Sequence, residues 1–430
     1  MRSVRFLVVL GLLLSPTVPA TAADSVAVVR AKLEKIAGLR IESGRLMNGR
    51  PFFVLRYAQP ADHDKLQGER FEQRITLWHK GFDRPTVLHT TGYEGVAGAF
   101  AAEPTRLVEG NQLNVEQRFF AGSTPASKDW STLDIRQAAT DHHRIVEAFK
   151  TVYAAKWLST GASKGGMTSV YHRRFYPADV DATVAYVAPQ DVVNQQDTYV
   201  DFIQRAGADE TCNESLRTLQ RNALYRRATL LPMLVARGEK YTTAYGSADR
   251  AFEAAVLETP FKFWQYKTPA SCARIPGRTA TDQQLFTFID QIADFTSYSD
   301  AGIEPYRAYF YQASGQLNWP DVSSGTTWLK GLLHYPEAAA APATIPNPPP
   351  HDDQAMADVD RWVRSAATRM LFVYGENDPW SAEKFEPGPG SKDCHWFTVP
   401  AGNHAAAIAD LPAAQRAAAT DLLKDWVSAP

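Results

Sequence analysis

The chain has 430 residues, of which 45% are hydrophobic and 11% aromatic, as in an ordinary globular protein. This length allows one large domain with a sizeable insertion, or two domains. The formal net charge is only −2 and no block of like charge stands out, so a nucleic-acid partner is not expected.

The first 22 residues have the pattern of an export signal. Arg2 and Arg5 form a positive start, residues 6–14 form a short apolar core, and Ala-Thr-Ala at 20–22 supplies a cleavage site. A buried N-terminal helix is the alternative interpretation. The apolar run is far shorter than the roughly 20 residues that span a bilayer, and no later segment reaches that length, so we expect no membrane partner. The mature protein is therefore expected to be secreted, to the periplasm or the medium.

Strand-like and helix-like stretches alternate through the first half of the mature chain. Aromatic and branched residues predict two opening strands, Phe52–Tyr57 and Phe71–Lys80, as an antiparallel pair. The pattern then predicts, in chain order, strand Pro85–Thr91, strand Leu113–Phe120, amphipathic helix Thr132–Tyr153, strand Lys156–Thr160, helix Lys164–Phe175 and strand Ala182–Val187. The short links between these elements predict an α/β fold, with a mainly parallel sheet and helices on both faces.

The pattern changes near Val192. From there to about Ala340 the sequence is helix-like and aromatic-rich, and Pro342–Pro350 follows as an extended proline-rich linker. Strands are predicted again at Arg369–Tyr374 and Trp396–Val399, before a closing helix at Pro412–Val427. These changes divide the chain into the export signal over 1–22, the first part of an α/β domain over 23–191, an inserted helical cap over 192–349, and the second part of the α/β domain over 350–430.

The segment Gly161-Ala162-Ser163-Lys164-Gly165 matches the pattern G-x-S-x-G of a nucleophile elbow. Such an elbow is a sharp turn between a strand and a helix, and only small residues fit two places before and after its serine. A strand is predicted directly before this segment and a helix directly after it. A chance Gly/Ser turn is the alternative, but the context favours Ser163 as a catalytic nucleophile.

A serine hydroxyl is a poor nucleophile until a neighbouring base takes its proton, so a histidine is required. Of the ten histidines, His404 follows the last predicted strand on a glycine-containing loop, where a base can reach a serine at the end of the sheet. His395 is the nearest rival, but we expect it to precede that strand. His142 and His143 lie on the predicted amphipathic helix, where a packing or surface role is favoured.

The acid that orients such a histidine is expected at the end of the preceding strand. The predicted strand Arg369–Tyr374 runs into a turn that carries Asp378, and Glu376 in the same turn is the alternative. An Asn-Asp-Pro turn can also be purely structural. The order serine, acid, histidine at strand ends is that of the α/β-hydrolase fold, so we predict that fold with Asp378 as the acid.

An acyl-transfer site also needs backbone N–H groups where negative charge develops in the transition state. The first expected donor is the N–H of Lys164, the residue after the nucleophile. The second is expected from the loop Gly92–Gly95 after an early strand, where Tyr93 N–H is the natural choice. An ordinary glycine turn is the alternative interpretation of this loop.

Five segments together resemble those of the secreted bacterial prolyl tripeptidyl aminopeptidases, and more distantly those of lysosomal prolylcarboxypeptidase and dipeptidyl peptidase II. They are Gly92–Gly95, Glu116–Pro125, Leu133–Asp141, Gly161–Met167 and Asn377–Trp380. The resemblance covers most of the mature chain. Lys164 stands where the lysosomal relatives have tyrosine, and in this position the chain resembles the bacterial enzymes. The segment Tyr311–Ser314 resembles part of a cap motif of the family but lacks its Cys-Thr pair.

The resemblance implies cleavage after proline and release of a tripeptide from peptide substrates with a free N-terminus. A carboxylate near the site could hold the α-ammonium group, and Glu94 is the candidate, with a loop-stabilising role as the alternative. Gln312 in the cap is a second polar candidate. Trp380 and Tyr93 could form the flat walls of a proline pocket, although both could equally be core residues.

Export would place the three cysteines in an oxidising compartment. The first choice is a disulfide between Cys212 and Cys272, with Cys394 free and buried, while the other two pairings stay open. No HExxH motif, Cys/His cluster or glycine-rich phosphate loop is present, so neither a metal nor a cofactor is expected. A secreted lipase or carboxylesterase, or a catalytically silent binding protein of the same fold, remains an alternative.

Overall fold

The computed structural model describes residues 22–193, 197–207, 210–335 and 350–428. The expected export signal lies outside these residues except for Ala22, and the expected linker lies outside them except for Pro350.

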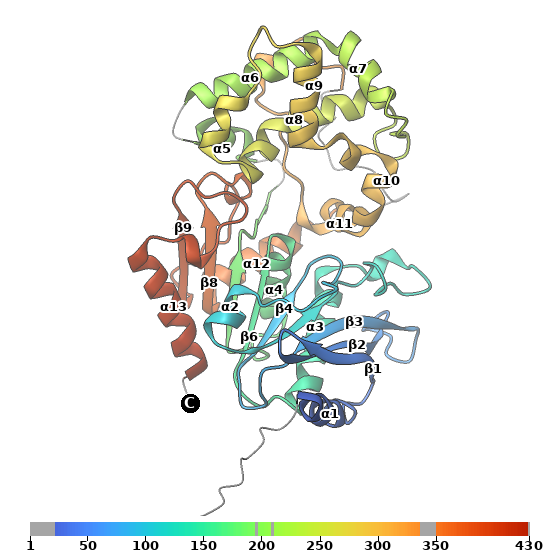
Figure 1. Ribbon diagram of the computed structural model, residues 1–430, viewed down its shortest axis with the longest axis vertical. Helices are drawn as coiled ribbons and strands as arrows, with labels where there is room; N and C mark the ends of the chain where they lie inside the picture. The colour runs from blue at the N-terminus through green and yellow to red at the C-terminus, as the bar shows by residue number, and fades with distance from the viewer. Residues whose placement is uncertain (1–21, 194–196, 208–209, 336–349, 429–430) are drawn as a thin grey trace, which may run out of the picture.

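The centre of the molecule is a nine-stranded sheet in the order β1-β2-β3-β5-β4-β6-β7-β8-β9, which occupies the lower half of Figure 1. The pairs β1–β2, β2–β3 and β3–β5 are antiparallel, and every later pair is parallel. The strands are β1 (Leu39–Met47), β2 (Arg50–Pro60), β3 (Arg70–Trp78), β4 (Thr86–Thr90), β5 (Asn111–Val115), β6 (Trp157–Ala162), β7 (Ala182–Tyr186), β8 (Thr368–Gly375) and β9 (Lys392–Val399). This topology is the predicted α/β-hydrolase fold.

Helices cover both faces of the sheet because its strands alternate their apolar side chains between two cores. Along β8, Met370 and Phe372 pack into the core beneath α4 and α12, whereas Leu371 and Val373 pack into the core beneath α2 and α13. The helices of this domain are α1 (Ala22–Leu33), α2 (Glu103–Leu107), α3 (Ile135–Lys150), α4 (Lys164–Phe175), α12 (Asp353–Ser365) and α13 (Ala413–Ser428).

Several elements differ from the sequence prediction. The sequence prediction lacks strand β1. The residues of this strand are half-exposed or exposed at the sheet edge, which weakens the hydrophobic pattern. Helices α1, α2 and α12 are also missing, although α12 carries buried residues at helical spacing. Strand β5 ends at Val115 instead of Phe120, and helix α3 starts at Ile135 because the Asp134 side chain caps it by accepting the Gln137 N–H.

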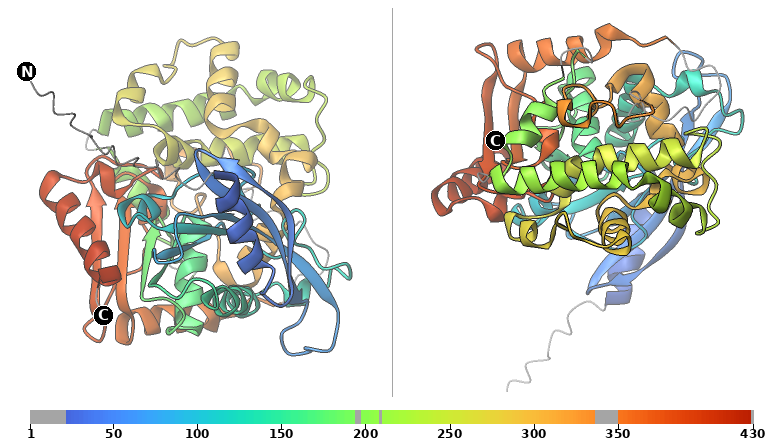
Figure 2. Two further views of the ribbon diagram at one scale, coloured as in Figure 1. Left: turned by 60° about the horizontal axis from the view of Figure 1, so that its bottom comes forward. Right: turned by 90° about the horizontal axis from the view of Figure 1, so that it is seen from above.

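Between β7 and α12 the described chain forms a helical cap, seen at the top of Figure 1 and from above in the right panel of Figure 2. Its helices are α5 (Tyr199–Arg205), α6 (Glu210–Tyr225), α7 (Arg227–Val235), α8 (Ala248–Tyr266), α9 (Asp282–Ala293), α10 (Asp300–Ile303) and α11 (Arg307–Gln312). They enclose an aromatic-rich core of their own, which includes Phe252, Trp264 and Phe295. The exact boundaries at 192 and 349 stay a prediction. Within the described ranges, no helix has both the length and the apolar character needed to cross a membrane.

The cysteines form the expected pair. Cys212 on α6 is bonded to Cys272, which lies in the 3-10 helix Pro269–Arg274. Cys394 is free but only half-buried, so the expectation of a buried thiol was wrong. The reason is its position on β9, the edge strand of the sheet, which has no neighbouring strand on its outer side.

Removing the disulfide should destabilise the cap, because the bond closes a loop with a sequence separation of 60 residues. Chain entropy alone predicts a loss of about 4 kcal/mol for a loop of this size. The double variant Cys212→Ser/Cys272→Ser should therefore unfold at a clearly lower temperature in a calorimetric scan. Cys394→Ser serves as the control and should keep the wild-type midpoint; an equal midpoint for the double variant would contradict the prediction.

Candidate active site

Ser163 lies between the end of β6 and the start of α4 with φ 55° and ψ −130°, a conformation that non-glycine residues rarely adopt. The turn is tight enough that a Cβ on Gly161 would lie 2.4 Å from the carbonyl group of Gly165. Thr90 Oγ1 reinforces the contact by donating a hydrogen bond of 2.7 Å to Gly165 O. The strained serine is thus held from both sides by the neighbouring strand and helix.

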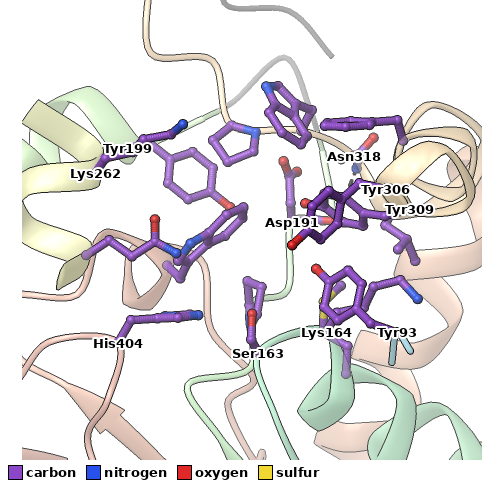
Figure 3. Close-up of a pocket in the computed structure, with 18 of the residues that line it drawn as sticks. Tyr93, Ser163, Lys164, Asp191, Tyr199, Lys262, Tyr306, Tyr309, Asn318 and His404 are labelled. Carbon is purple, nitrogen blue, oxygen red and sulfur yellow. Dashed lines mark hydrogen bonds between the residues drawn. The ribbon is translucent and has the colours of Figure 1, made fainter. Parts of the chain in front are cut away.

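His404 and Asp378 form a hydrogen-bonded pair beside this turn. Nδ1–H of His404 donates to Asp378 Oδ2 at 2.7 Å, and the aspartate is fully buried. Asp378 Oδ1 also accepts the Trp380 N–H at 3.2 Å, which fixes the carboxylate. His404 Nε2 has no hydrogen-bond partner among the described residues, and its ring points toward Ser163 in Figure 3. One ring nitrogen is therefore held by the acid while the other faces the serine.

The alternative residues are engaged elsewhere. The Glu376 carboxylate accepts the N–H of Ala401, so it supports the histidine loop rather than the histidine itself. His395 lies within β9, not before it as expected, and contacts Asp393 at 2.9 Å. Buried His142 bonds to Ala138 O, and burial lowers its pKa to about 4. None of these side chains lines the cavity that contains Ser163 and His404.

The loop Gly92–Gly95 is pressed against the start of α4. Gly92 has φ 72°, and a Cβ there would lie 2.6 Å from Gly165 N, so no other residue fits without displacement. A hydrogen bond fixes the other end of the loop, because the buried Glu116 carboxylate accepts the Gly95 N–H at 3.0 Å. This contact gives a structural role to the Glu116–Pro125 segment.

The two N–H groups that we expect to bind the oxyanion differ in their present hydrogen bonding. Lys164 is the first residue of α4, so its N–H has no acceptor within the helix and lies at the positive end of the helix dipole. Tyr93 N–H instead donates to Thr91 Oγ1 of its own loop at 3.3 Å. Because that bond is long, a substrate oxyanion could compete for the donor.

The Lys164 side chain is a site feature that the sequence did not predict. It is 3% exposed, and its ammonium donates to Gly92 O at 2.6 Å. The same group lies 5.3 Å from the ring centroids of both Tyr93 and Phe120, within cation–π range. Burial lowers the pKa of Lys164 to about 7. The lysine thus links the helix after Ser163 to the loop that carries Tyr93.

Ser163, Lys164 and His404 open into a cavity of about 560 Å³ between the α/β domain and the cap. This volume is within the range of about 300–1,000 Å³ that is usual for small-ligand sites. Six aromatic side chains of the cap line it: Tyr199, Tyr266, Tyr306, Tyr309, Phe310 and Trp319. Figure 3 shows the serine and histidine on its floor, with cap tyrosines above.

The predicted substrate-binding residues do not all reach this cavity. Tyr93 and Trp380 line it, and Glu94 lines it as an exposed side chain at its rim. Gln312 is buried at the end of α11 and is not among the lining residues, so its role as a substrate contact stays a prediction without support from this cavity. On that helix Tyr309 and Phe310 line the cavity instead.

The cap is bonded directly to the loops that carry His404 and Asp378. His404 N–H donates to Gln265 O at the end of α8 at 3.0 Å. Asn377, next to the acid, accepts the Gly207 N–H at 2.9 Å. The position of the cap is therefore coupled to the geometry of the His404–Asp378 pair.

Two comparisons with known proteins, one with family models and one with individual sequences, both point to a peptidase family. The model of the PS-10 peptidase S37 family matches residues 22–430. A prolyl tri/tetrapeptidyl aminopeptidase of Streptomyces mobaraensis is 45% identical over 410 residues, which cover 93% of this chain and 84% of the relative.

Two solved structures show a distant likeness. A proline iminopeptidase from Mycobacterium smegmatis is 12% identical with a TM-score of 0.41, over 87% of this chain and 99% of the other. Epoxide hydrolase A from Mycobacterium thermoresistibile is 14% identical with a TM-score of 0.36, over 90% and 98%.

The buried lysine should give stability a specific pH dependence. Between about pH 7 and the ordinary lysine pKa of 10.5, the unfolded chain binds a proton at Lys164 that the folded chain has lost. Wild-type stability should therefore rise with pH in this window relative to Lys164→Met, by about 1.4 kcal/mol per pH unit at most. Melting temperatures of both proteins at pH 6 and pH 9.5 measure this, and a pH-independent difference would contradict it.

Proposed function

This chain belongs to the PS-10 peptidase S37 family, and from that membership we propose that it is an exopeptidase that cleaves after proline near free N-termini. Tri- or tetrapeptides are the proposed products, as the name of the Streptomyces relative suggests. The observation that carries the proposal is the His404–Asp378 hydrogen bond in the same cavity as a strained serine.

In the proposed reaction, Ser163 Oγ attacks the carbonyl carbon after proline while His404 Nε2 takes the hydroxyl proton. Asp378 stabilises the imidazolium that forms and keeps the proton on Nδ1, so that Nε2 presents its lone pair. The tetrahedral oxyanion would be bound by Lys164 N–H, with Tyr93 N–H as the second donor.

The intermediate then collapses as the bond between the carbonyl carbon and the amide nitrogen breaks. The leaving amine takes the proton from His404 and departs, which leaves the short peptide esterified to Ser163. A water molecule, deprotonated by His404, attacks this ester in the second half of the reaction. Release of the peptide acid returns the proton to Ser163.

The aromatic cavity supports the proposed preference for proline. The Trp380 ring lies 6.2 Å from that of His404 and is held edge-on by Phe261 at 5.1 Å. Tyr93 makes edge contacts with Phe120 at 5.5 Å and Tyr309 at 5.7 Å. Rings fixed in this way offer flat apolar walls beside the serine, suited to the pyrrolidine ring of proline.

The wild-type protein should release Ala-Ala-Pro from a peptide that has a free N-terminus and proline at position three. Ser163→Ala should lower kcat by at least about 10³-fold, because the nucleophile is lost while the fold is kept. Mass spectrometry of the products measures both the rate and the length of the released peptide.

Two parallel assays provide the controls. An unchanged melting temperature would show that Ser163→Ala is folded, and labelling of the wild type alone by a fluorophosphonate would show an activated serine. A wild-type protein that hydrolyses nitrophenyl esters but no prolyl amide would contradict the proposal and favour the esterase alternative. Turnover retained by Ser163→Ala would contradict the mechanism.

We also propose that the protein is secreted. The residue pattern over 1–22 and the disulfide in the cap both support export to an oxidising compartment. Expression of the full chain in a bacterial host should yield a protein that starts at Ala23 in the periplasm or medium, which N-terminal sequencing can establish. An uncleaved chain that stays in the cytoplasm would contradict this proposal.

A further inference from the structure

A second carboxylate lines the active-site cavity, on the link between β7 and α5. Asp191 is 4% exposed, and neither of its carboxylate oxygens accepts a hydrogen bond from a described residue. In Figure 3 it points into the cavity above Ser163. Its backbone is fixed, since Asn318 donates a hydrogen bond of 3.1 Å to Asp191 O. The Asn318 amide also lies near the carboxyl group and opposes the rise of its pKa, but no described residue makes a hydrogen bond of ordinary geometry to either carboxyl oxygen.

Among the residues that the structure describes, no cation compensates for the burial of Asp191. The two lysines of the cavity are engaged elsewhere: Lys164 with Gly92 O, and Lys262 with Ala293 O at 3.0 Å and with Glu258 at 3.5 Å. Burial, with the charges of Asp197 and Glu383, raises the pKa of Asp191 to about 8. A buried carboxylate without a partner is costly, so a ligand that brings a positive charge and N–H donors would relieve that cost.

A second acceptor without a partner lies in the same wall. Tyr199 is fully buried, and its hydroxyl has no hydrogen-bond partner among the described residues although it lines the cavity. An ammonium group has three N–H donors. The Asp191 carboxylate and the Tyr199 hydroxyl can accept hydrogen bonds from these donors. An acylated amine is neutral and has fewer N–H donors, so it would bind these acceptors less well.

We propose that Asp191 and the Tyr199 hydroxyl form the subsite that binds the α-ammonium group of the peptide substrate. The inference rests on the proposed exopeptidase function and adds the residues that recognise the free N-terminus. An anchor for the first residue at a fixed distance from Ser163 also determines which peptide bond reaches the nucleophile. Asp191 therefore contributes to the length of the released peptide as well as to the requirement for a free amine.

Asp191 fits this role better than Glu94, the carboxylate that the sequence favoured. Glu94 is exposed at the cavity rim, where water already solvates its charge and screens its attraction to an ammonium group. Asp191 lies in a low-dielectric wall, where a charge-assisted hydrogen bond is stronger. Of these two carboxylates, the buried one is better placed to distinguish a free amine from a blocked one.

The test compares Ala-Ala-Pro-nitroanilide with its N-acetylated form in the wild type and in Asp191→Asn. The variant should raise KM for the free-amine substrate by about ten- to a hundredfold, with little change in kcat, because a charge-assisted hydrogen bond is lost. Its activity on the acetylated substrate should change by less than about threefold. Its melting temperature should stay close to that of the wild type, since Asn has nearly the same volume as Asp and the carboxyl oxygens make no hydrogen bond that the substitution would remove.

Three further variants make the test specific. Asp197→Asn is the matched control, because it removes a neighbouring carboxylate that does not line the cavity, and it should keep the preference for the free amine. Tyr199→Phe should weaken that preference by a smaller factor than Asp191→Asn, and it tests the subsite if Asp191→Asn fails to fold. Glu94→Gln should keep the preference if Asp191 is the anchor.

The outcomes separate the two proposals. A wild type that prefers the free amine while Asp191→Asn and Tyr199→Phe keep that preference would overturn the subsite alone. Loss of the preference in Glu94→Gln but not in Asp191→Asn would assign the anchor to Glu94 instead. A wild type that cleaves both substrates equally well would overturn the exopeptidase function and the subsite together.

Discussion

The site depends on a backbone contact that leaves no space for side chains. The ends of β4 and β6 and the start of α4 meet where a Cβ on Gly161 would lie 2.4 Å from Gly165, and one on Gly92 would lie 2.6 Å from the same residue. This contact forces Ser163 into its strained conformation and places the Lys164 N–H beside it. The parallel order of β6, β7, β8 and β9 then brings the loops of Asp378 and His404 to the same edge.

The cap completes the site rather than merely covering it. Trp380 and Ala382 of the α/β domain pack against its core, the end of α8 bonds to the backbone of His404, and Gly207 bonds to Asn377. The same cap supplies most of the aromatic rings of the cavity. A displacement of the cap would therefore change both the shape of the pocket and the support of the histidine loop.

Two buried ionisable groups of opposite sign line the cavity without neutralising each other. Lys164 is bonded to a backbone carbonyl and packed between two rings, and Asp191 has no bonded partner among the described residues. Burial shifts the pKa of each toward its neutral form, to about 7 for the lysine and about 8 for the aspartate. Buried ionisable groups destabilise a fold, and strongly shifted pKa values are typical of functional sites. For this reason we assign the aspartate to substrate recognition.

Local patterns along the chain were sufficient to predict several features of this protein. The glycines around Ser163, the order of Asp378 and His404 after late strands, and the alternation of strands and helices all depend on neighbours in the chain, so the fold and the candidate triad could be predicted. Strand β1 was missed because exposed edge strands have a weak hydrophobic pattern.

Which distant side chains share the cavity follows from the tertiary structure alone. It places Gln312 outside the cavity lining, shows the hydrogen bond of the Lys164 side chain, and distinguishes the exposed Glu94 from the buried Asp191. The physical reason is that burial and hydrogen-bond satisfaction depend on how the cap packs against the sheet. Residue type and spacing carry no record of that packing.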